Sequence, residues 1–165
     1  MTVVADSSPL IILAKLNCFD FLRELYSQLC ISTEVYEEVV ITGAGLPGAS
    51  QVAASGWIEV RSIHNPATLS AARKKLGLGV GELSTIILGQ ELGAQAVLLD
   101  DFKARELAKK EGLSVRGTVG ILETLHRQGH VSDLRLKFQQ LIMHNVYIDR
   151  RILDRRLRSL GIAPL

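Results

Sequence analysis

Acidic residues stand at four places in the sequence where an apolar segment ends or a helix is expected to begin. They are Asp6, the pair Glu37 and Glu38, Glu82, and the pair Asp100 and Asp101. Carboxylates that meet in one cleft repel one another and raise each other's pKa, unless a cation offsets their charge. Oxygen ligands suit Mg²⁺ or Mn²⁺, and such sites are the usual means of hydrolysing a phosphodiester bond. The pattern therefore predicts a divalent-metal site with nuclease chemistry.

Each acid also has an ordinary structural interpretation. Acidic side chains favour the first turn of a helix, so Asp6 could cap a helix at Pro9, and Asp101 could cap one at Phe102. Glu82 is likewise expected in a first helical turn. The chemical interpretation depends on the four places coming together in the fold.

Other kinds of site find less support. The four histidines share no spacing, and neither they nor the two cysteines cluster as zinc ligands do. The glycines of GLGVGE, residues 77–82, resemble a phosphate-binding loop, but neither GxGxxG after a strand nor a GKS or GKT signature is present. We therefore expect neither a zinc site nor nucleotide binding.

Short apolar strands alternate with helical segments along most of the chain. Strands are expected at 2–5, 29–31, 57–60, 95–99 and 113–115. This order predicts an α/β fold with three layers, in which helices cover both faces of a parallel sheet. Ligands of such sheets bind beyond the carboxyl ends of the strands. Because Asp6 and the pair Asp100 and Asp101 follow strands directly, we expect them at the same edge of the sheet.

Helices are expected between the strands and through the C-terminal part of the chain. Their ranges are 9–16, 17–26, 33–41, 70–76, 82–92, 102–111 and 117–129, with helix throughout from 131. At 165 residues the chain fits one domain. We expect a core, 1–130, followed by a helical C-terminal extension, 131–165.

Composition restricts the class of protein. Apolar residues make up 47% and charged residues 22%, as in soluble globular proteins. The N-terminus lacks the basic segment of a signal peptide, and no apolar run approaches the roughly 18 residues of a membrane span. We therefore expect a cytoplasmic protein in which Cys18 and Cys30 are buried thiols.

Positive charge is concentrated near the C-terminus. Residues 126–158 contain eight Lys or Arg against three Asp, although the net charge of the chain is only +2. Such a segment could follow a phosphate backbone, with Arg150, Arg151, Arg155 and Arg156 as candidate contacts. On charge alone, a solvated helix face is at least as good an interpretation.

Five segments carry a more specific signal when they are taken together. In chain order they are VVADSSPLI, VYEEV, GVGELSTIIL, VLLDDFKARELA and GTVGIL, and they extend over roughly residues 2–130. The ordered set resembles the PIN-domain ribonucleases, above all the VapC-like toxins of prokaryotic toxin–antitoxin pairs. The resemblance implies a parallel sheet of four or five strands between helices. It also implies three or four acidic residues that bind Mg²⁺ or Mn²⁺ and cut single-stranded RNA, leaving a 5′-phosphate and a 3′-hydroxyl.

The resemblance assigns roles to individual acids. Asp6 corresponds to the first acid of the family and Glu82 to the third. Periodicity leaves the second acid open, because Glu37 and Glu38 flank the apolar face of their helix about equally. The family pattern V-x-x-E selects Glu38.

The fourth acid has two candidates. Many family members have T-x-D after this strand, which aligns Leu99 with the threonine and Asp101 with the acid. Because the threonine is missing here, Asp100 and Asp101 are both kept, with Asp101 preferred. The expected metal ligands are thus Asp6, Glu82, Asp101 and Asp100, and Glu38 completes the catalytic set.

Two further residues could support the acids. By resemblance, Ser8 could hold the Asp6 carboxylate or a metal-bound water, or it could merely cap the helix at Pro9. Arg105, one helical turn beyond Asp101, could contact the scissile phosphate. A salt bridge between Arg105 and Asp101 is the more conservative interpretation.

The leading hypothesis is a metal-dependent endoribonuclease in which a metal-activated water cleaves single-stranded RNA, as the toxin of a toxin–antitoxin pair. The alternative is a catalytically weak PIN-like protein that acts mainly as a binding module, with the Arg-rich segment 146–165 as its dimer or antitoxin surface. By resemblance, a homodimer and an antitoxin partner are expected. A flap-like DNA nuclease shares the metal chemistry, but it normally has more acids and helical elements than this chain has room for.

Overall fold

The first part of the chain folds around a parallel sheet. The structure, a computed structural model, describes all 165 residues, which form two compact units, Met1–Gly117 and Thr118–Leu165. The first unit contains five strands in the order β3-β2-β1-β4-β5, and every neighbouring pair is parallel. The strands are β1 (Thr2–Ala5), β2 (Gln28–Ser32), β3 (Ile58–Arg61), β4 (Ala96–Leu98) and β5 (Val115–Arg116).

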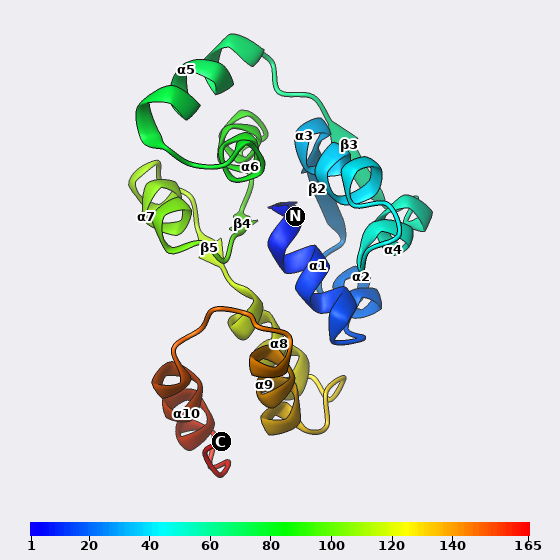
Figure 1. Cartoon of the computed structure of the whole chain (residues 1–165), viewed down its shortest axis with the longest axis vertical. Helices are drawn as coiled ribbons and strands as arrows, with labels where there is room; N and C mark the ends of the chain where they lie inside the picture. Colours follow the sequence, from blue (N-terminus) through cyan, green and yellow to red (C-terminus); the bar gives the residue numbers. More distant parts are fainter. The chain divides into compact units, whose positions relative to one another are not determined.

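Helices flank this sheet. They are α1 (Ser7–Lys15), the 3₁₀ turn η1 (Phe19–Phe21), α2 (Leu22–Leu25), α3 (Thr33–Tyr36), the π-helix η2 (Glu37–Thr42), α4 (Ala49–Ala54), α5 (Pro66–Leu76), α6 (Val80–Glu91) and α7 (Phe102–Lys110). Helices α1, α2 and α4 lie on one side of the strands, and α5, α6 and α7 on the other (Figure 1). Right-handed crossovers between parallel strands produce this division. The expected α/β fold with a parallel sheet between helices is confirmed.

Two expected helices have different bounds in the structure. The range 17–26 contains only η1 and α2, since Asn17 adopts a left-handed backbone conformation (φ 56°) that ends α1. Helix α5 begins earlier than residue 70, because the Asn65 side chain accepts a hydrogen bond from the Ala67 N–H at 3.1 Å and Pro66 suits a first helical position.

The strand order places two acidic segments side by side. Strand β2 pairs with one side of β1, and β4 pairs with its other side, so the direction in which strands are added changes at β1. Ala5 lies opposite Leu98, and the Asp6 N–H donates to the Leu98 carbonyl at 3.0 Å. Open parallel sheets bind ligands at such a change of direction, beyond the carboxyl ends of the strands. Asp6 and the segment after Leu98 both lie at this place.

Helix α6 packs closely on the sheet. The residues Val4, Val97 and Leu99 belong to one buried apolar cluster with side chains from α5, α6 and α7. A Cβ on Gly89 would lie only 2.7 Å from Val97 Cγ1, so a glycine is needed where α6 crosses β4. This contact fixes α6, whose first turn carries Glu82.

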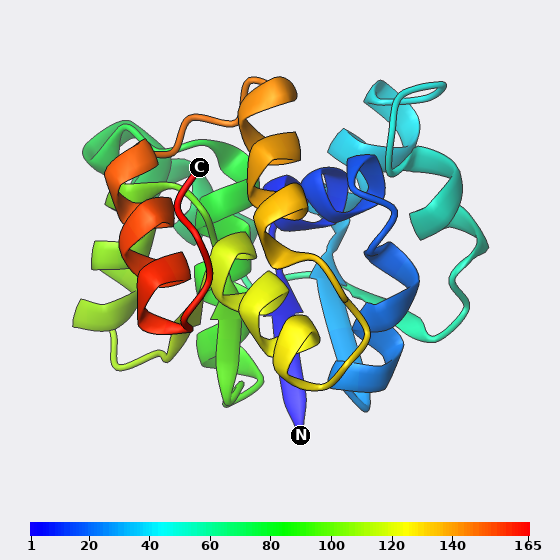
Figure 2. The same cartoon turned by 90° about the horizontal axis from the view of Figure 1, so that it is seen from below.

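The second unit is entirely helical apart from its connections. It contains α8 (Thr118–Arg127), α9 (Leu134–Met143) and α10 (Arg150–Ser159), which run from yellow to red in Figure 2. The part of the chain after residue 131 is helical as expected, and it forms two separate helices, because Asp133 caps α9 and Asp149 caps α10. The compact units divide at Gly117, which groups α8 with α9 and α10. The single domain expected for 1–165 stays a prediction.

None of the helices combines the length and the hydropathy that a membrane-spanning segment requires.

Candidate functional site

Asp6 is the most buried acid of the candidate site. It occupies the N-cap position of α1 with only 3% of its surface exposed, yet its side chain accepts no capping hydrogen bond from the helix. The Ser7 hydroxyl donates to Asp6 Oδ1 at 3.4 Å. Burial, followed by the negative charges of Glu82 and Glu38, raises the pKa of Asp6 to about 7, although hydrogen bonds from Ser7 act in the opposite direction. The ordinary capping role therefore does not account for this carboxylate.

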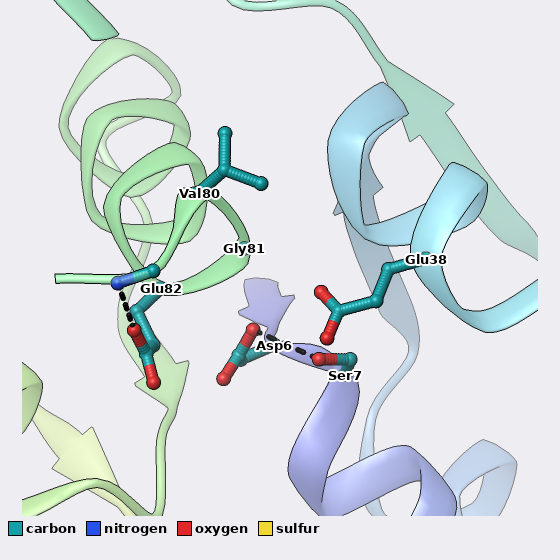
Figure 3. Close-up of a pocket in the computed structure, with 7 residues that line it drawn as sticks. Asp6, Ser7, Glu38, Val80, Gly81 and Glu82 are labelled. Carbon is teal, nitrogen blue, oxygen red and sulfur yellow. Dashed lines mark hydrogen bonds between the residues drawn. The ribbon is translucent and has the colours of Figure 1, made fainter. Parts of the chain in front are cut away.

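Glu38 reaches the site from η2. Its side chain extends toward Asp6 and Ser7, whereas Glu37 does not line the pocket (Figure 3). In η2 the Gly43 N–H bonds the Glu38 carbonyl at 3.0 Å, five residues back instead of four. The helical wheel left Glu37 and Glu38 equivalent, and the lining of the pocket distinguishes them.

Glu82 and Gly81 come from the first turn of α6. Glu82 Oε2 accepts a hydrogen bond from the Gly79 N–H at 2.6 Å. Burial raises the pKa of Glu82, as do the charges of Asp101 and Glu38, while the bond from Gly79 lowers it. The charge of Glu82 thus interacts with those of Asp6, Glu38 and Asp101, which belong to three other segments of the chain.

Gly81 allows two of the carboxylates to approach each other. A Cβ at this position would lie 2.7 Å from Glu38 Oε2 and 2.9 Å from Asp6 Oδ1. Both oxygens therefore face one point above the Gly81 α-carbon, and any larger residue would occupy it. In the sequence, Gly81 belongs to the GLGVGE pattern and to the family segment GVGELSTIIL, but no role was predicted for it. The signal that could have revealed one is its place directly before the candidate acid Glu82.

One pocket collects these residues. It is lined by Asp6, Ser7, Glu38, Gly79, Val80, Gly81 and Glu82, and Figure 3 shows Asp6 between Glu82 and Glu38. The first three acids named by the family pattern thus come together from β1, η2 and α6, far apart in the sequence.

The two aspartates after β4 lie beside this pocket and do not line it. Asp101 is the N-cap of α7 and accepts from the Ala104 N–H at 2.9 Å, although its charge reaches Glu82. Asp100 is half-buried and accepts from the Ser8 hydroxyl at 3.1 Å. Asp101 is thus electrostatically coupled to the pocket, whereas Asp100 is bonded to α1.

The two supporting residues, Ser8 and Arg105, make contacts other than those expected. Helix α1 begins at Ser7, so Ser8 lies inside the first turn and bonds Asp100, while the neighbouring Ser7 bonds Asp6. The Arg105 guanidinium donates to the Leu99 carbonyl at 3.1 Å instead of pairing with Asp101.

The comparisons with known proteins decide the family. The model of the PIN domain family matches residues 2–162 of the chain. The chain belongs to the PIN domain family. This is a nuclease-type superfamily, and PIN domains typically use divalent metals.

A PilT N-terminus domain protein from the hyperthermophilic archaeon Sulfolobus solfataricus P2 has a similar structure, at 18% sequence identity and a TM-score of 0.49. The alignment covers 75% of this chain and 92% of that one. No curated protein sequence matches the chain.

The acids of this PIN domain fit a hard divalent cation by their chemistry. The pocket offers carboxylate and hydroxyl oxygens and neither imidazole nor thiolate. Burial first, and then the charges of Glu82 and Glu38, raise the pKa of Asp6 to about 7, and a bound cation would favour its charged form. No group of three or more acidic, histidine or cysteine side chains is already arranged to hold a metal ion. One reason is that Glu82 bonds Gly79, so it would have to rotate to join Asp6 and Glu38.

A buried serine pair joins two elements of the PIN-domain site. The Ser32 hydroxyl caps α3 by accepting from the Val35 N–H at 3.0 Å, and it lies 2.7 Å from the Ser84 hydroxyl of α6. The Ser84 hydroxyl donates to the Gly81 carbonyl at 2.9 Å, so Ser32 must supply the proton between the two serines. The bonds thus run in one direction, from α3 to Gly81.

The arginines expected to contact RNA lie on α10 of the second unit. Arg156 Nη1 bonds Glu123 Oε2 at 2.6 Å and so fastens α10 to α8, while Arg151 pairs with Asp149 at 2.8 Å. Arg150 lies 4.0 Å from a carboxylate oxygen of Asp154, and Arg155 is exposed. Arg156 therefore has a structural role, and RNA contact by this set stays a prediction.

Proposed function

We propose that this PIN-domain protein is a metal-dependent endoribonuclease that cleaves single-stranded RNA. The observation that carries the proposal is the meeting of Asp6, Glu38 and Glu82 in one pocket beside Gly81. Paired carboxylates at the carboxyl edge of a parallel sheet, in a family of nucleases, are better explained by phosphodiester hydrolysis than by helix capping.

The acids have separable roles in this proposal. Asp6, Glu38 and Glu82 would hold the Mg²⁺ or Mn²⁺, with Asp101 or Asp100 as the fourth acid. When bound, the ion would lower the pKa of a water molecule and offset charge on the phosphate. Because the pKa of Asp6 is about 7, its carboxyl group is partly protonated at neutral pH and must release that proton for the site to become fully anionic. Ser7 orients Asp6 through its hydroxyl.

We further propose that the protein acts as a VapC-like toxin whose activity an antitoxin restrains. The ordered VapC-like segments of the sequence support this biological role. A homodimer in the cytoplasm is part of the same proposal.

The second candidate function is a protein-binding module with weak catalysis. Large apolar side chains are exposed on the second unit, among them Met143 (75% exposed) and Tyr147 (104% exposed). Exposed apolar side chains of this kind can be buried against a partner protein.

The deciding experiment measures cleavage of a mixed-sequence single-stranded RNA by the purified protein in Mg²⁺, Mn²⁺ or EDTA. We expect metal-dependent cutting that falls at least a hundredfold in Asp6→Asn and Glu82→Gln. RNA cleavage should fall similarly in Glu38→Gln. Glu37 lies outside the pocket, so Glu37→Gln should keep the activity of the natural protein. Calorimetric titration with Mn²⁺ reports metal binding independently of cleavage.

A folded, partner-free protein that neither binds Mn²⁺ nor cuts RNA would overturn the nuclease proposal and favour the binding module. Equal loss of activity in Glu37→Gln and Glu38→Gln would contradict the assignment of the second acid.

A further inference from the structure

The end of α5 carries positive charges that no acidic residue balances. Arg73, Lys74 and Lys75 are exposed in its last turn, and α5 contains no acid. None of the three takes part in an ion pair. A fourth cation, Lys103 of α7, donates to the Leu76 carbonyl at 3.4 Å and so lies at the same helix end.

This cationic group is close to the acidic pocket. Helix α5 ends at Gly77, and Gly79, two residues later, lines the pocket. The segment from Leu76 to Gly79 spans at most roughly 10 Å when fully extended. In the segment that connects β4 to β5, Lys103 follows the acid Asp101 by two residues. The cations of α5 and Lys103 are thus each only a few residues along the chain from the acidic pocket or from Asp101.

Helix stability alone explains this group poorly. A helix C-terminus carries about half a negative charge, which one or two cations satisfy. Adjacent like charges repel one another, so further cations at the same end bring a cost. Helix α7 provides the contrast, because it ends with Lys109 and Lys110, and Lys109 pairs with Glu106 at 3.0 Å.

Binding of the proposed RNA substrate would explain the excess positive charge at the end of α5. Asp6, Glu38 and Glu82 form a negative pocket, which repels the polyanionic backbone of RNA until charge is offset. Cations beside the pocket attract that backbone and hold it near the acids, without reading its sequence.

We propose that Arg73, Lys74, Lys75 and Lys103 form a phosphate-binding strip, the α5 strip, that holds the sugar–phosphate backbone of single-stranded RNA beside the acidic pocket. This inference rests on the proposed function, since it names how the same site holds its substrate. It assigns the main RNA contact to the first unit of the chain.

The test compares two double variants that remove the same charge from equivalent places. Lys74→Gln with Lys75→Gln changes the last turn of α5, and Lys109→Gln with Lys110→Gln changes the last turn of α7. Binding of a fluorescent mixed-sequence single-stranded RNA to the full chain is measured by anisotropy in EDTA, so that cleavage does not interfere. Thermal melting checks that each variant is folded.

We expect the α5 variant to bind RNA about tenfold more weakly at low salt, and the α7 variant to bind like the natural protein. The slope of log K against log salt should decrease by about 1.4 in the α5 variant, because two phosphate contacts are removed and roughly 0.7 counterions are released per contact. Lys103→Gln should weaken binding by a smaller factor in the same direction.

Equal effects of the two double variants would overturn the α5 strip, since binding would then depend on total charge. Unchanged RNA binding by the α5 variant, in a protein that still cuts RNA, would overturn the strip and leave the proposed function standing. A natural protein that neither binds nor cuts RNA would overturn both.

Discussion

At the scale of single residues, the candidate site depends on a missing side chain as much as on its acids. Glu38 Oε2 and Asp6 Oδ1 both face the α-carbon of Gly81. Both are terminal atoms of side chains, so they can rotate away if a methyl group is added there. Such a rotation would separate the two carboxylates while the backbone stays in place.

We therefore expect Gly81→Ala to impair the site without unfolding the protein. Mn²⁺ affinity, measured by calorimetry, should fall at least tenfold, and RNA cleavage should fall with it. The free energy of unfolding should change by less than about 1 kcal/mol, because alanine favours a helix by up to that amount.

Gly120→Ala is the matched control for this variant, since Gly120 is also helical but has no atom within 4 Å of an added Cβ. It should leave metal affinity unchanged. Full metal affinity and activity in Gly81→Ala would show that the two carboxylates do not act together.

At the scale of elements, the serine pair holds the two helical segments that supply Glu38 and Glu82. Ser32 and Ser84 are both fully buried and bonded to each other across β2 and α6. Removing one hydroxyl breaks the bond between the two serines and that hydroxyl's second bond, to Val35 or to Gly81, which costs about 1–3 kcal/mol.

Ser32→Ala and Ser84→Ala should each destabilise the protein by about that amount, measured by urea unfolding. The double variant should be less destabilised than the sum of the two, by about 1 kcal/mol, because one bond is lost in all three. We also expect weaker Mn²⁺ binding in each variant, since α3 and α6 lose their connection.

Thr85→Val is the control, because the Thr85 hydroxyl is buried next to Ser84 and has no partner. It should not lower stability. Strictly additive effects of the two serine variants, or unchanged metal binding in all of them, would contradict the positioning role.

At the scale of the whole molecule, the acidic pocket links stability to pH. The pKa of Asp6 is about 7 in the fold and 3.8 without its surroundings, so the folded protein binds a proton that the unfolded chain has released. The stability that this bound proton contributes is fully present below about pH 4 and is lost as the pH rises toward 7. The raised pKa of Glu82 acts in the same direction.

We expect the metal-free protein to lose stability between about pH 4 and pH 7, by on the order of 4 kcal/mol from Asp6 alone. Urea unfolding in EDTA at a series of pH values measures this loss. Saturating Mn²⁺ at pH 7.5 should raise the melting temperature, because the ion binds only the folded state.

In Asp6→Asn both effects should be much smaller, since the amide does not titrate and removes a ligand. A natural protein whose stability is constant over this range would contradict the burial of an ionisable Asp6.

The sequence by itself determined the order of strands and helices along the chain and the edge of the sheet at which two groups of acids lie. Asp6 and the pair Asp100 and Asp101 follow apolar strands, and in a parallel sheet the residues after neighbouring strands must share an edge. Local pattern was sufficient here because Asp6 follows β1 directly and Asp100 follows the end of β4 by two residues. The same reasoning could not show that Ser8 bonds Asp100, since this contact joins residues 92 positions apart.

Only the tertiary structure decided which acids lie in the pocket and what holds them there. Periodicity left Glu37 and Glu38 open and the family pattern favoured Glu38, and the fold places Glu38 in the pocket. The close approach at Gly81 and the bond between Ser32 and Ser84 join distant segments. Likewise, Glu123 engages Arg156, a basic residue that the charge count treated as available for RNA. The physical reason is common to these cases: sequence periodicity records which side of an element faces the core, whereas contacts between polar atoms depend on how separate elements pack.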